Sequence, residues 1–398
     1  MNPLAVATSR PITVMVVYGT RPEAIKMAPL ILALRSDPRF RVQVVVTGQH
    51  REMLDQVNDS FGILPDRDLD IHQPRQTLTS ITIRTLERLT GALAELRPDA
   101  VLVQGDTSTT FVAGLAAFYA GVTVVHTEAG LRTGDPTSPF PEEINRRLTT
   151  QLASLHLAPT AAARANLVRE NVDPAAVVVT GNSVIDALLI TVAKRPQIED
   201  PELATRLSLG RPVVAVTAHR RESWGEPLRQ VGRAVARLAT AHPDHDFVFP
   251  AHRNPLVREA ILPSVEGCSN VIVTEPLPYT QFCALLERAA VLLTDSGGVQ
   301  EEGPSLGKPV LVMRETTERP EAVIAGTVRL VGTGEDAIVR AVSELLTDAA
   351  AYDAMARAVN PYGDGRAAER TVKALARHYG FDEVVEEFAA ASAVATVA

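Results

Sequence analysis

The stretch ITVMVVYGTRPEAIKM, residues 12–27, decides the fold class of this 398-residue chain. Its first part, Ile12–Tyr18, is almost wholly apolar and rich in β-branched side chains, which is typical of a strand buried on both faces. Gly19 follows this run, and Thr20 and Glu23 then have the spacing of a helical capping box. A strand that leads directly into a helix is the repeating unit of doubly wound α/β domains.

The same alternation of short apolar runs and longer helical patterns continues outward from this stretch. Strands separated by helices need crossover connections, so the pattern predicts largely parallel sheets with helices on both faces. The alternation restarts after Gly181, which predicts a second sheet. The predicted strands are Ile12–Tyr18, Val42–Thr47, Ala100–Gln104, Val122–His126, Ser154–Leu157 and Val177–Thr180 in the first set, and Val213–Thr217, Asp246–Phe249, Val271–Thr274, Val291–Thr294, Pro309–Val312 and Val328–Val331 in the second.

The length and the 46% hydrophobic content predict two domains, because one core rarely grows to this size. We expect a Rossmann-like domain over residues 1–182, a second over 183–365, and a C-terminal helix and tail over 366–398. The Ala-rich end, 388–398, is interpreted as a fraying helical tail. Ligands bind at the carboxyl ends of strands in open α/β sheets, so we predict an active site in a cleft between the domains.

Composition excludes several classes of function. The net charge of −8 disfavours nucleic acid as a partner, and no run approaches the roughly 18 apolar residues of a membrane span. Only two cysteines are present, Cys268 and Cys283, which suits a reducing compartment and predicts a cytoplasmic protein. The histidines lack zinc-binding spacing, so we predict no metal.

Two segments have the character of phosphate sites. Arg21 and Lys26 lie at the predicted helix start after Gly19, where a positive helix dipole and cations would hold a diphosphate. An ordinary helix cap with solvated basic residues is the alternative. In the second half, the run 294–298, TDSGG, joins a strand to a helix, and its glycines allow a phosphate close to the backbone. A plain strand-to-helix turn is the alternative there.

Carboxylates also collect at predicted strand ends. Asp106 and Glu128 each follow a strand, and Glu142 opens the helix after a Gly/Pro-rich loop. Three carboxylates on one rim repel each other, which is costly unless proton transfer needs them. Asp106 could instead serve as an N-cap. His219 follows the first strand of the second set and faces the same rim, with a structural histidine as the alternative.

These residues lie in motifs that give the chain a close resemblance to a known family, the non-hydrolysing UDP-N-acetylglucosamine 2-epimerases. Members of that family have the glycosyltransferase-B architecture of two Rossmann-like domains. The matching segments are 19–27, 49–54, 105–107, 128–134, 141–143, 217–222, 294–302 and 316–321.

The resemblance implies an isomerase that inverts C2 of UDP-N-acetylglucosamine to give UDP-N-acetylmannosamine, through loss of UDP to a 2-acetamidoglucal and its return, without a cofactor. Leu277 departs from some relatives, which carry Gln there, and leaves the uracil contact to the backbone. By resemblance, the catalytic residues are Asp106, Glu128, Glu142 and His219, and the substrate-binding residues are Arg21, Lys26, Phe282, Ser296, Gly297, Gly298, Glu302 and Arg319.

The resemblance also implies a homodimer, a role in cell-surface polysaccharide biosynthesis, and a second UDP-N-acetylglucosamine bound as an activator. Three alternatives stay open: a hydrolysing 2-epimerase or one acting on a UDP-diacetamido sugar, a glycosyltransferase of the same architecture, and a non-catalytic UDP-sugar sensor. The residues that match the activator pocket are Gln49, Arg75, Glu142, Arg220 and His252.

Overall fold

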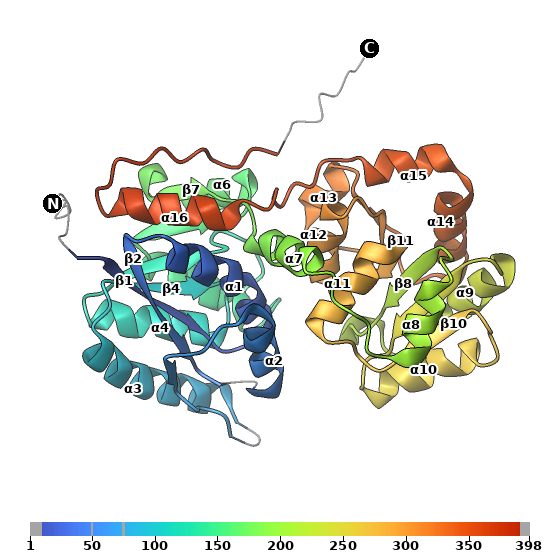
Figure 1. Ribbon diagram of the computed structural model, residues 1–398, viewed down its shortest axis with the longest axis horizontal. Coiled ribbons are helices and arrows are strands. Elements are labelled where there is room, and N and C mark those ends of the chain that lie inside the picture. The colour runs from blue at the N-terminus through green and yellow to red at the C-terminus, as the bar shows by residue number, and fades with distance from the viewer. Residues whose placement is uncertain (1–9, 49–50, 74–75, 391–398) are drawn as a thin grey trace, which may run out of the picture. The chain divides into compact units, whose positions relative to one another are not determined.

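The computed structural model describes residues 10–48, 51–73 and 76–390, which fold into two α/β units (Figure 1). Unit 1 comprises the described residues up to Ala187 together with Tyr362–Ala389, and unit 2 comprises Leu188–Pro361 and Ala390. Each unit is built on its own parallel sheet. The predicted fold class of two doubly wound domains is confirmed.

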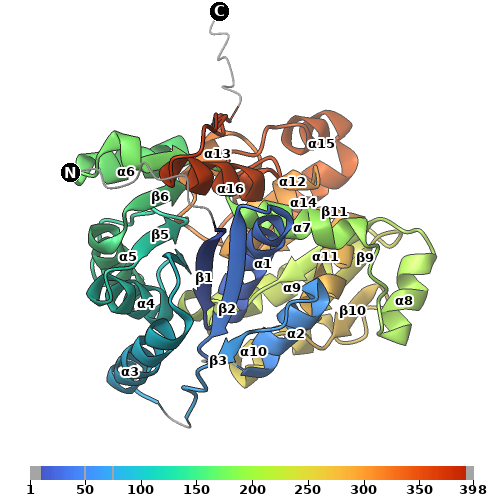
Figure 2. The same ribbon diagram turned by 60° about the vertical axis from the view of Figure 1, so that its left-hand side comes forward.

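In the described residues, unit 1 has a seven-stranded parallel sheet in the order β3-β2-β1-β4-β5-β6-β7. The central strand β1 is buried along its whole length, as expected for a strand covered on both faces. Figure 2 shows α3, α4 and α5 on one side of β1 and β2, and α1 on the other. The strands are β1 (Ile12–Tyr18), β2 (Phe40–Val46), β3 (Arg67–Asp68), β4 (Ala100–Gln104), β5 (Thr123–Thr127), β6 (Leu155–Ala158) and β7 (Val177–Val179), and the helices are α1 (Arg21–Ser36), α2 (Arg51–Phe61), α3 (Leu78–Leu96), α4 (Ser108–Tyr119), α5 (Glu142–Leu152), α6 (Ala161–Arg169), the 3-10 turn η1 (Pro174–Ala176), α7 (Ser183–Ala193) and α16 (Ala367–His378).

Unit 2 has a six-stranded parallel sheet in the order β10-β9-β8-β11-β12-β13. Its elements are the strands β8 (Val213–Thr217), β9 (Asp246–Pro250), β10 (Val271–Thr274), β11 (Ala289–Thr294), β12 (Val310–Val312) and β13 (Val328–Leu330), and the helices α8 (Pro201–Ser208), η2 (Arg221–Ser223), α9 (Glu226–Ala241), α10 (Pro255–Val265), α11 (Tyr279–Arg288), α12 (Gly297–Ser305), α13 (Pro320–Ile324), α14 (Glu335–Thr347) and α15 (Ala349–Ala356).

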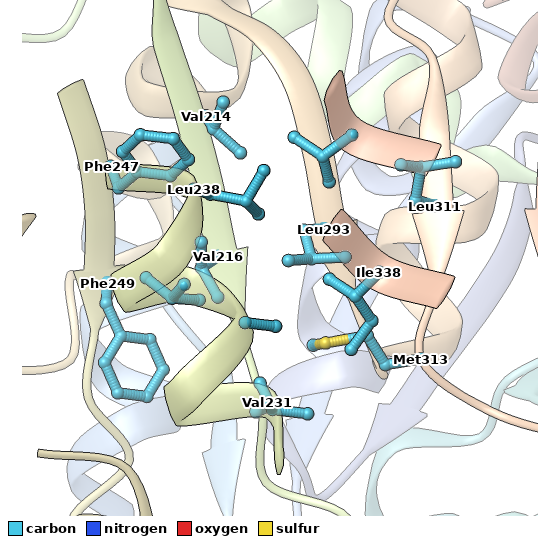
Figure 3. Close-up of a cluster of buried hydrophobic side chains, with 14 of the residues drawn as sticks. Val214, Val216, Val231, Leu238, Phe247, Phe249, Leu293, Leu311, Met313 and Ile338 are labelled. Carbon is cyan, nitrogen blue, oxygen red and sulfur yellow. The ribbon is translucent and has the colours of Figure 1, made fainter. Parts of the chain in front are cut away.

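One hydrophobic core cluster of unit 2 combines side chains of this sheet with those of the helices α9, α10 and α14, and Figure 3 shows part of it. Side chains from four neighbouring strands meet there, so their packing holds the strands in register. The labelled side chains in the figure are Val214, Val216, Phe247, Phe249, Leu293, Leu311 and Met313 from the strands and strand ends, with Val231, Leu238 and Ile338 from the helices.

All twelve predicted strands are present, with ends that differ by up to two residues. The structure adds β3, two exposed residues that pair with the edge of β2. Sequence pattern could not indicate so short a strand, because Arg67 and Asp68 carry no apolar periodicity.

The division into units differs from the predicted boundaries at 182 and 365. Helix α7 begins in unit 1, where the carboxylate of Asp186 accepts hydrogen bonds from the backbone N–H groups of Ala367 (3.2 Å) and Ala368 (2.8 Å). These bonds tie the start of α16 to unit 1, and α16 packs on α1. The predicted C-terminal region therefore belongs to the first unit, because its helix completes that unit's core.

The predicted helical tail differs as well where it is described. Phe388–Ala390 is not helical: Phe388 is buried, and its N–H donates to the carbonyl of Val179 at 2.8 Å. The guanidinium of Arg370 lies 5.6 Å from the Phe388 ring, which adds a cation–π contact. Residues 391–398 of that prediction lie outside the described residues.

Two kinds of feature are absent from the part of the chain that the structure describes. No helix there is both long and apolar enough to cross a membrane. No group of three or more His, Cys, Asp or Glu side chains there is arranged to hold a metal ion.

Candidate active site

The turn from β1 into α1 is organised by a buried carboxylate. Glu23 Oε2 accepts hydrogen bonds from the backbone N–H groups of Thr20 (2.8 Å) and Gly19 (3.1 Å), as the capping-box spacing predicted. Its other oxygen accepts from the hydroxyl of Thr107 at 2.7 Å, which links α1 to the start of α4. Burial raises the pKa of Glu23, and these hydrogen bonds oppose the rise.

The diphosphate site predicted at this turn stays a prediction, and the structure shows which of its groups have partners within the protein. Two of its backbone N–H groups are already bound to Glu23, and Lys26 Nζ lies 2.5 Å from Glu128 Oε1 in an ion pair. Arg21, the first residue of α1, is half-buried and has no ion-pair partner within the described ranges. Arg21 is therefore the cation of this turn that an anionic ligand would meet.

Glu128 follows β5 in a strained backbone conformation, with φ of +56°. Three donors contact its carboxylate: Lys26 Nζ at 2.5 Å and Asn182 Nδ2 at 3.0 Å on Oε1, and Gln104 Nε2 at 2.5 Å on Oε2. Its side chain is only 9% exposed. These contacts fix the direction in which the carboxylate points.

Asp106 stands one strand away from Glu128, beyond the end of β4. The preceding Gly105 has φ of +69°, and a Cβ there would lie 3.2 Å from Glu128 Oε2, so this turn brings the two carboxylates close. Arg146 of α5 forms an ion pair with Asp106. Burial raises the pKa of Asp106, the negative charge of Glu128 raises it further, and Arg146 opposes the rise.

The two acids on the first turn of α5 differ in environment. Glu143 is fully buried and accepts from the backbone N–H groups of Thr133 (3.1 Å) and Gly134 (3.3 Å), which fixes the loop before the helix. Glu142 is half-buried and starts the same helix that carries Arg146 to Asp106. Glu142 is thus positioned on the element that contacts the carboxylate pair, and Glu143 has a structural role.

A buried histidine supports the turn at Gly105. The imidazole Nε2 of His126 lies 2.7 Å from the Gly105 carbonyl oxygen, and burial lowers the pKa of His126 to about 3. The ring is therefore neutral at physiological pH, and Nε2 carries the proton that it donates to this carbonyl.

Unit 2 contains a second group of polar side chains, around His219 at the end of β8. His219 Nδ1 lies 2.9 Å from Asp295 Oδ1, and Asp295 Oδ2 accepts from the backbone N–H groups of His219 (2.6 Å) and Arg220 (2.8 Å). Burial raises the pKa of Asp295, but these contacts outweigh burial and lower the pKa below its usual value. Asp295 therefore stays ionised and orients the imidazole.

Asp295 also begins the predicted phosphate loop, which runs from β11 into α12. Ser296 is the N-cap of α12, and Gly297 and Gly298 are its first residues. The Arg319 side chain lies over Gly297: a Cβ on Gly297 would be 2.6 Å from Arg319 Nη1. Arg319 Nε donates to Glu301 Oε1 at 2.6 Å, so a helix N-terminus and a fixed guanidinium stand together.

The remaining predicted UDP contacts lie beside this loop. Glu302 is buried in α12, and the Tyr279 hydroxyl lies 3.5 Å from its Oε1. Phe282, in the first turns of α11, is half-buried. Leu277 is buried just before that helix.

Of the residues predicted for an activator pocket, Gln49 and Arg75 lie outside the described residues. Arg220 is half-buried beside Asp295, where its Nε donates to the Asp295 carbonyl at 3.3 Å. His252 is exposed, and its ring stacks on that of His219 with 5.9 Å between centroids. Arg220 and His252 therefore both adjoin His219.

Sequence reasoning missed several side chains that hold the predicted residues in place. Asp295 belongs to the TDSGG run, and its position directly after a predicted strand could have indicated a functional role. Glutamine at a strand end or asparagine at a helix start carries no such signal by itself. The missed residues are Gln104, Arg146, Asn182, Asp295 and Glu301.

Comparison with known proteins connects this geometry to one family. A family model described as UDP-N-acetylglucosamine 2-epimerase matches residues 32–376. The UDP-N-acetylglucosamine 2-epimerase of Escherichia coli K12 is 54% identical over 370 residues, which cover 91% of this chain and 98% of that protein. The Bacillus subtilis 168 enzyme of the same name is 50% identical over 369 residues, covering 92% and 96%. The crystal structure of the Neisseria meningitidis UDP-GlcNAc 2-epimerase bound to UDP-GlcNAc is 46% identical with a TM-score of 0.83, and the alignment covers 92% of this chain and all of that one.

Proposed function

The chain belongs to the UDP-N-acetylglucosamine 2-epimerase family, and on that premise we propose how its residues convert UDP-N-acetylglucosamine reversibly into UDP-N-acetylmannosamine. The reaction inverts C2 of the sugar and leaves the composition unchanged. In the proposed sequence the C1–O bond to UDP breaks, the C2–H bond gives up its proton, and a C1=C2 double bond forms. A proton then adds to the opposite face of C2, and UDP returns to C1.

This order of events follows from the acidity of the C2–H bond. C1 is an acetal carbon, so no carbonyl group acidifies the proton on C2. Departure of UDP gives C1 oxocarbenium character, and only then can a carboxylate remove that proton. The enzyme therefore needs donors that stabilise the leaving diphosphate, and acid–base groups that address both faces of the sugar.

We assign the proton transfers to Asp106, Glu128 and Glu142 of unit 1. Asp106 and Glu128 are close to each other and have different electrostatic surroundings. Burial and the neighbouring charge raise the pKa of Asp106, whereas Glu128 is contacted by three donors. Environments that separate the proton affinities of two nearby acids are a mark of acid–base assignment. This pair of carboxylates is the single observation that carries the proposal.

We assign UDP binding to unit 2. The backbone N–H groups of Ser296–Gly298 at the start of α12, together with Arg319, suit a diphosphate. Glu302 has the acceptor oxygens that a ribose hydroxyl needs, and Phe282 offers an apolar face to uracil. His219, whose Nδ1 faces the Asp295 carboxylate, donates from Nε2 to the departing diphosphate when the imidazole carries both protons. Arg21 of unit 1 is a further proposed substrate-binding cation. Lys26, which pairs with Glu128, is likewise proposed as a substrate-binding residue.

The test is the reaction in D₂O, with purified protein and no added cofactor. Elimination removes the hydrogen from C2, so the product should carry deuterium there. NMR of the product reads both the configuration and the isotope. Clean epimerisation with protium retained at C2 would overturn the proposed mechanism.

The same NMR assay, combined with a binding measurement and a run with a diacetamido substrate, distinguishes the alternative functions. A hydrolysing epimerase would release free N-acetylmannosamine and UDP, and a glycosyltransferase would leave the C2–H bond untouched. A UDP-sugar sensor would bind the substrate without product. An enzyme for a diacetamido sugar would turn over that substrate faster than UDP-N-acetylglucosamine.

A second UDP-N-acetylglucosamine, bound as an activator, is the regulatory part of the proposal. It is supported by Arg220 and His252, which adjoin His219 and can pair with a second diphosphate. The reverse reaction from pure UDP-N-acetylmannosamine should then begin with a lag that traces of UDP-N-acetylglucosamine abolish. Linear progress from the first moment would contradict it.

A homodimer is the proposed assembly. It is supported by large apolar side chains exposed on the neighbouring helices α4 and α5: Phe118 and Tyr119 are 56% and 71% exposed, and Ile144 and Leu148 are 39% and 43% exposed. Light scattering should give twice the mass of one chain.

The free cysteines Cys268 and Cys283 suit the cytoplasm, where the product would feed cell-surface polysaccharide synthesis.

A further inference from the structure

The carboxylate of Glu128 is held by side chains whose own hydrogen bonds fix which end of each amide faces it. Asn182 is the clearest case. Its Oδ1 accepts from the backbone N–H of Val184 at 3.1 Å, so its Nδ2 is the end that faces Glu128 Oε1 at 3.0 Å. Lys26 Nζ has no acceptor capacity at all. Oε1 therefore receives two groups that can act only as donors.

Two donors occupy both lone-pair directions of a carboxyl oxygen, so a proton on Oε1 would have to displace one of them. A proton that Glu128 takes up consequently belongs on Oε2. That oxygen faces Gln104, whose Nε2 lies 2.5 Å away. The other end of the Gln104 amide, Oε1, lies 2.5 Å from the Thr127 hydroxyl, which is placed to donate to it. An amide turned the other way would set two acceptor oxygens against each other.

The surroundings make this arrangement rigid. Gln104 and Asn182 are 2% and 3% exposed, and the space bordered by Gln104, Glu128 and Asn182 has a volume of about 10 Å³, room for about one water molecule. The backbone of Glu128 is strained at φ +56°, a conformation that persists only where neighbours hold it.

We propose that Gln104 and Asn182 are positioning residues for Glu128: Asn182 and Lys26 hold Oε1 as a fixed acceptor, and Gln104 directs Oε2 as the atom that takes up and releases the proton. This inference rests on the proposed role of Glu128 in proton transfer. It assigns functions to two amide side chains that touch the carboxylate from β4 and from the turn before α7.

Several charged or titratable groups lie on the elements around Glu128. Lys26 on α1 pairs with it, and the charge of Glu128 interacts with Asp106 after β4 and with His126 on β5, which stays neutral. The other groups on these elements have partners of their own: Arg146 on α5 pairs with Asp106, Asp186 on α7 caps α16, and Arg370 on α16 pairs with Asp364.

The decisive variant is Gln104→Glu, which keeps the shape and replaces the donor facing Oε2 by an acceptor. Two carboxylates at that separation must share a proton, so the acidic limb of the kcat/KM profile should move up by about one pH unit or more. Activity lost near neutrality should return at higher pH. Asn182→Asp retains the bond to Val184 and should shift the limb in the same direction.

Gln43→Ala is the matched control for Gln104→Ala. Gln43 is also a buried strand glutamine of unit 1, but its amide donates to the Leu96 carbonyl at 3.1 Å, away from Glu128. Gln43→Ala should leave the pH profile in place, and Gln104→Ala should shift it. A uniform loss of kcat with an unmoved limb in both Gln104 variants would mean a purely structural role and would overturn the inference.

A second readout does not depend on turnover. In protein labelled with ¹³C at the glutamate carboxyl, the resonance missing from Glu128→Gln is that of Glu128. Its titration midpoint should rise by about one pH unit or more in Asn182→Asp, because a like charge replaces a donor. An unchanged midpoint would refute the positioning role, while failure of the wild-type protein to epimerise would refute only the proposed function.

Discussion

Replacing Gly297 by alanine isolates the contribution of Arg319 to UDP binding. The new Cβ would lie 2.6 Å from Arg319 Nη1 and 2.8 Å from its Cζ. Ordinary van der Waals contact begins near 3.4 Å, so the guanidinium must move by at least about 0.8 Å. Since the atoms that must move are at the far end of a long side chain and are not backbone, we expect the fold to tolerate the change.

The cost should appear in affinity. The displaced guanidinium cannot keep both its 2.6 Å bond to Glu301 and its place over the start of α12. A hydrogen bond to a charged group contributes about 1.5–3 kcal/mol, which corresponds to a roughly 10- to 150-fold rise in Kd. Isothermal titration calorimetry with UDP measures this rise, and circular dichroism checks the fold.

A double-mutant cycle provides the control. If Gly297→Ala acts by moving Arg319, then adding it to Arg319→Ala should change the Kd little, because the displaced group is already gone. Additive losses would show that the methyl group blocks the phosphate directly. Wild-type affinity in Gly297→Ala would refute the reasoning altogether.

The remaining predictions concern the carboxylates and one tight turn. Asp106→Asn and Glu128→Gln should each lower kcat by about 100-fold or more, because an amide cannot relay a proton; near-normal turnover by NMR assay in both would contradict the assignment. Burial raises the pKa of Asp186 to about 6, above its unfolded value, so the native state holds an extra proton and the free energy of unfolding should fall as pH rises from about 4 to 6, by on the order of 3 kcal/mol. Asp186→Asn should flatten that dependence in urea titrations, and an unchanged slope would exclude this group as its source. Gly130→Ala would place a Cβ 2.2 Å from a backbone carbonyl oxygen in α6 and should cost roughly 3 kcal/mol, whereas Gly134→Ala, with nothing within 4 Å, should lower the melting temperature much less.

The carboxylate pair shows how far sequence pattern reaches into the site. In a parallel sheet the carboxyl ends of the strands lie along one edge. The alternation of strands and helices alone therefore predicted that Asp106 and Glu128, which each follow a strand, would lie at that edge. Their contacts did not follow from the sequence, because the partners are Arg146 for Asp106 and Asn182 for Glu128, which lie 40 and 54 residues away along the chain. The role of Lys26 in binding diphosphate stays a prediction, and the structure adds its ion pair with Glu128, which the sequence did not indicate.

By itself, the sequence determined the fold class, every strand except β3 and the family, since hydrophobic periodicity and contiguous motifs are local properties of the chain. Tertiary structure alone decided three things: that α16 belongs to unit 1, that Glu301 and Asp295 hold Arg319 and His219, and that Glu128 carries different partners on its two oxygens. The physical reason is the same in each case. Burial and hydrogen-bond partnership depend on segments that are distant in sequence, and no local pattern records which of them will meet.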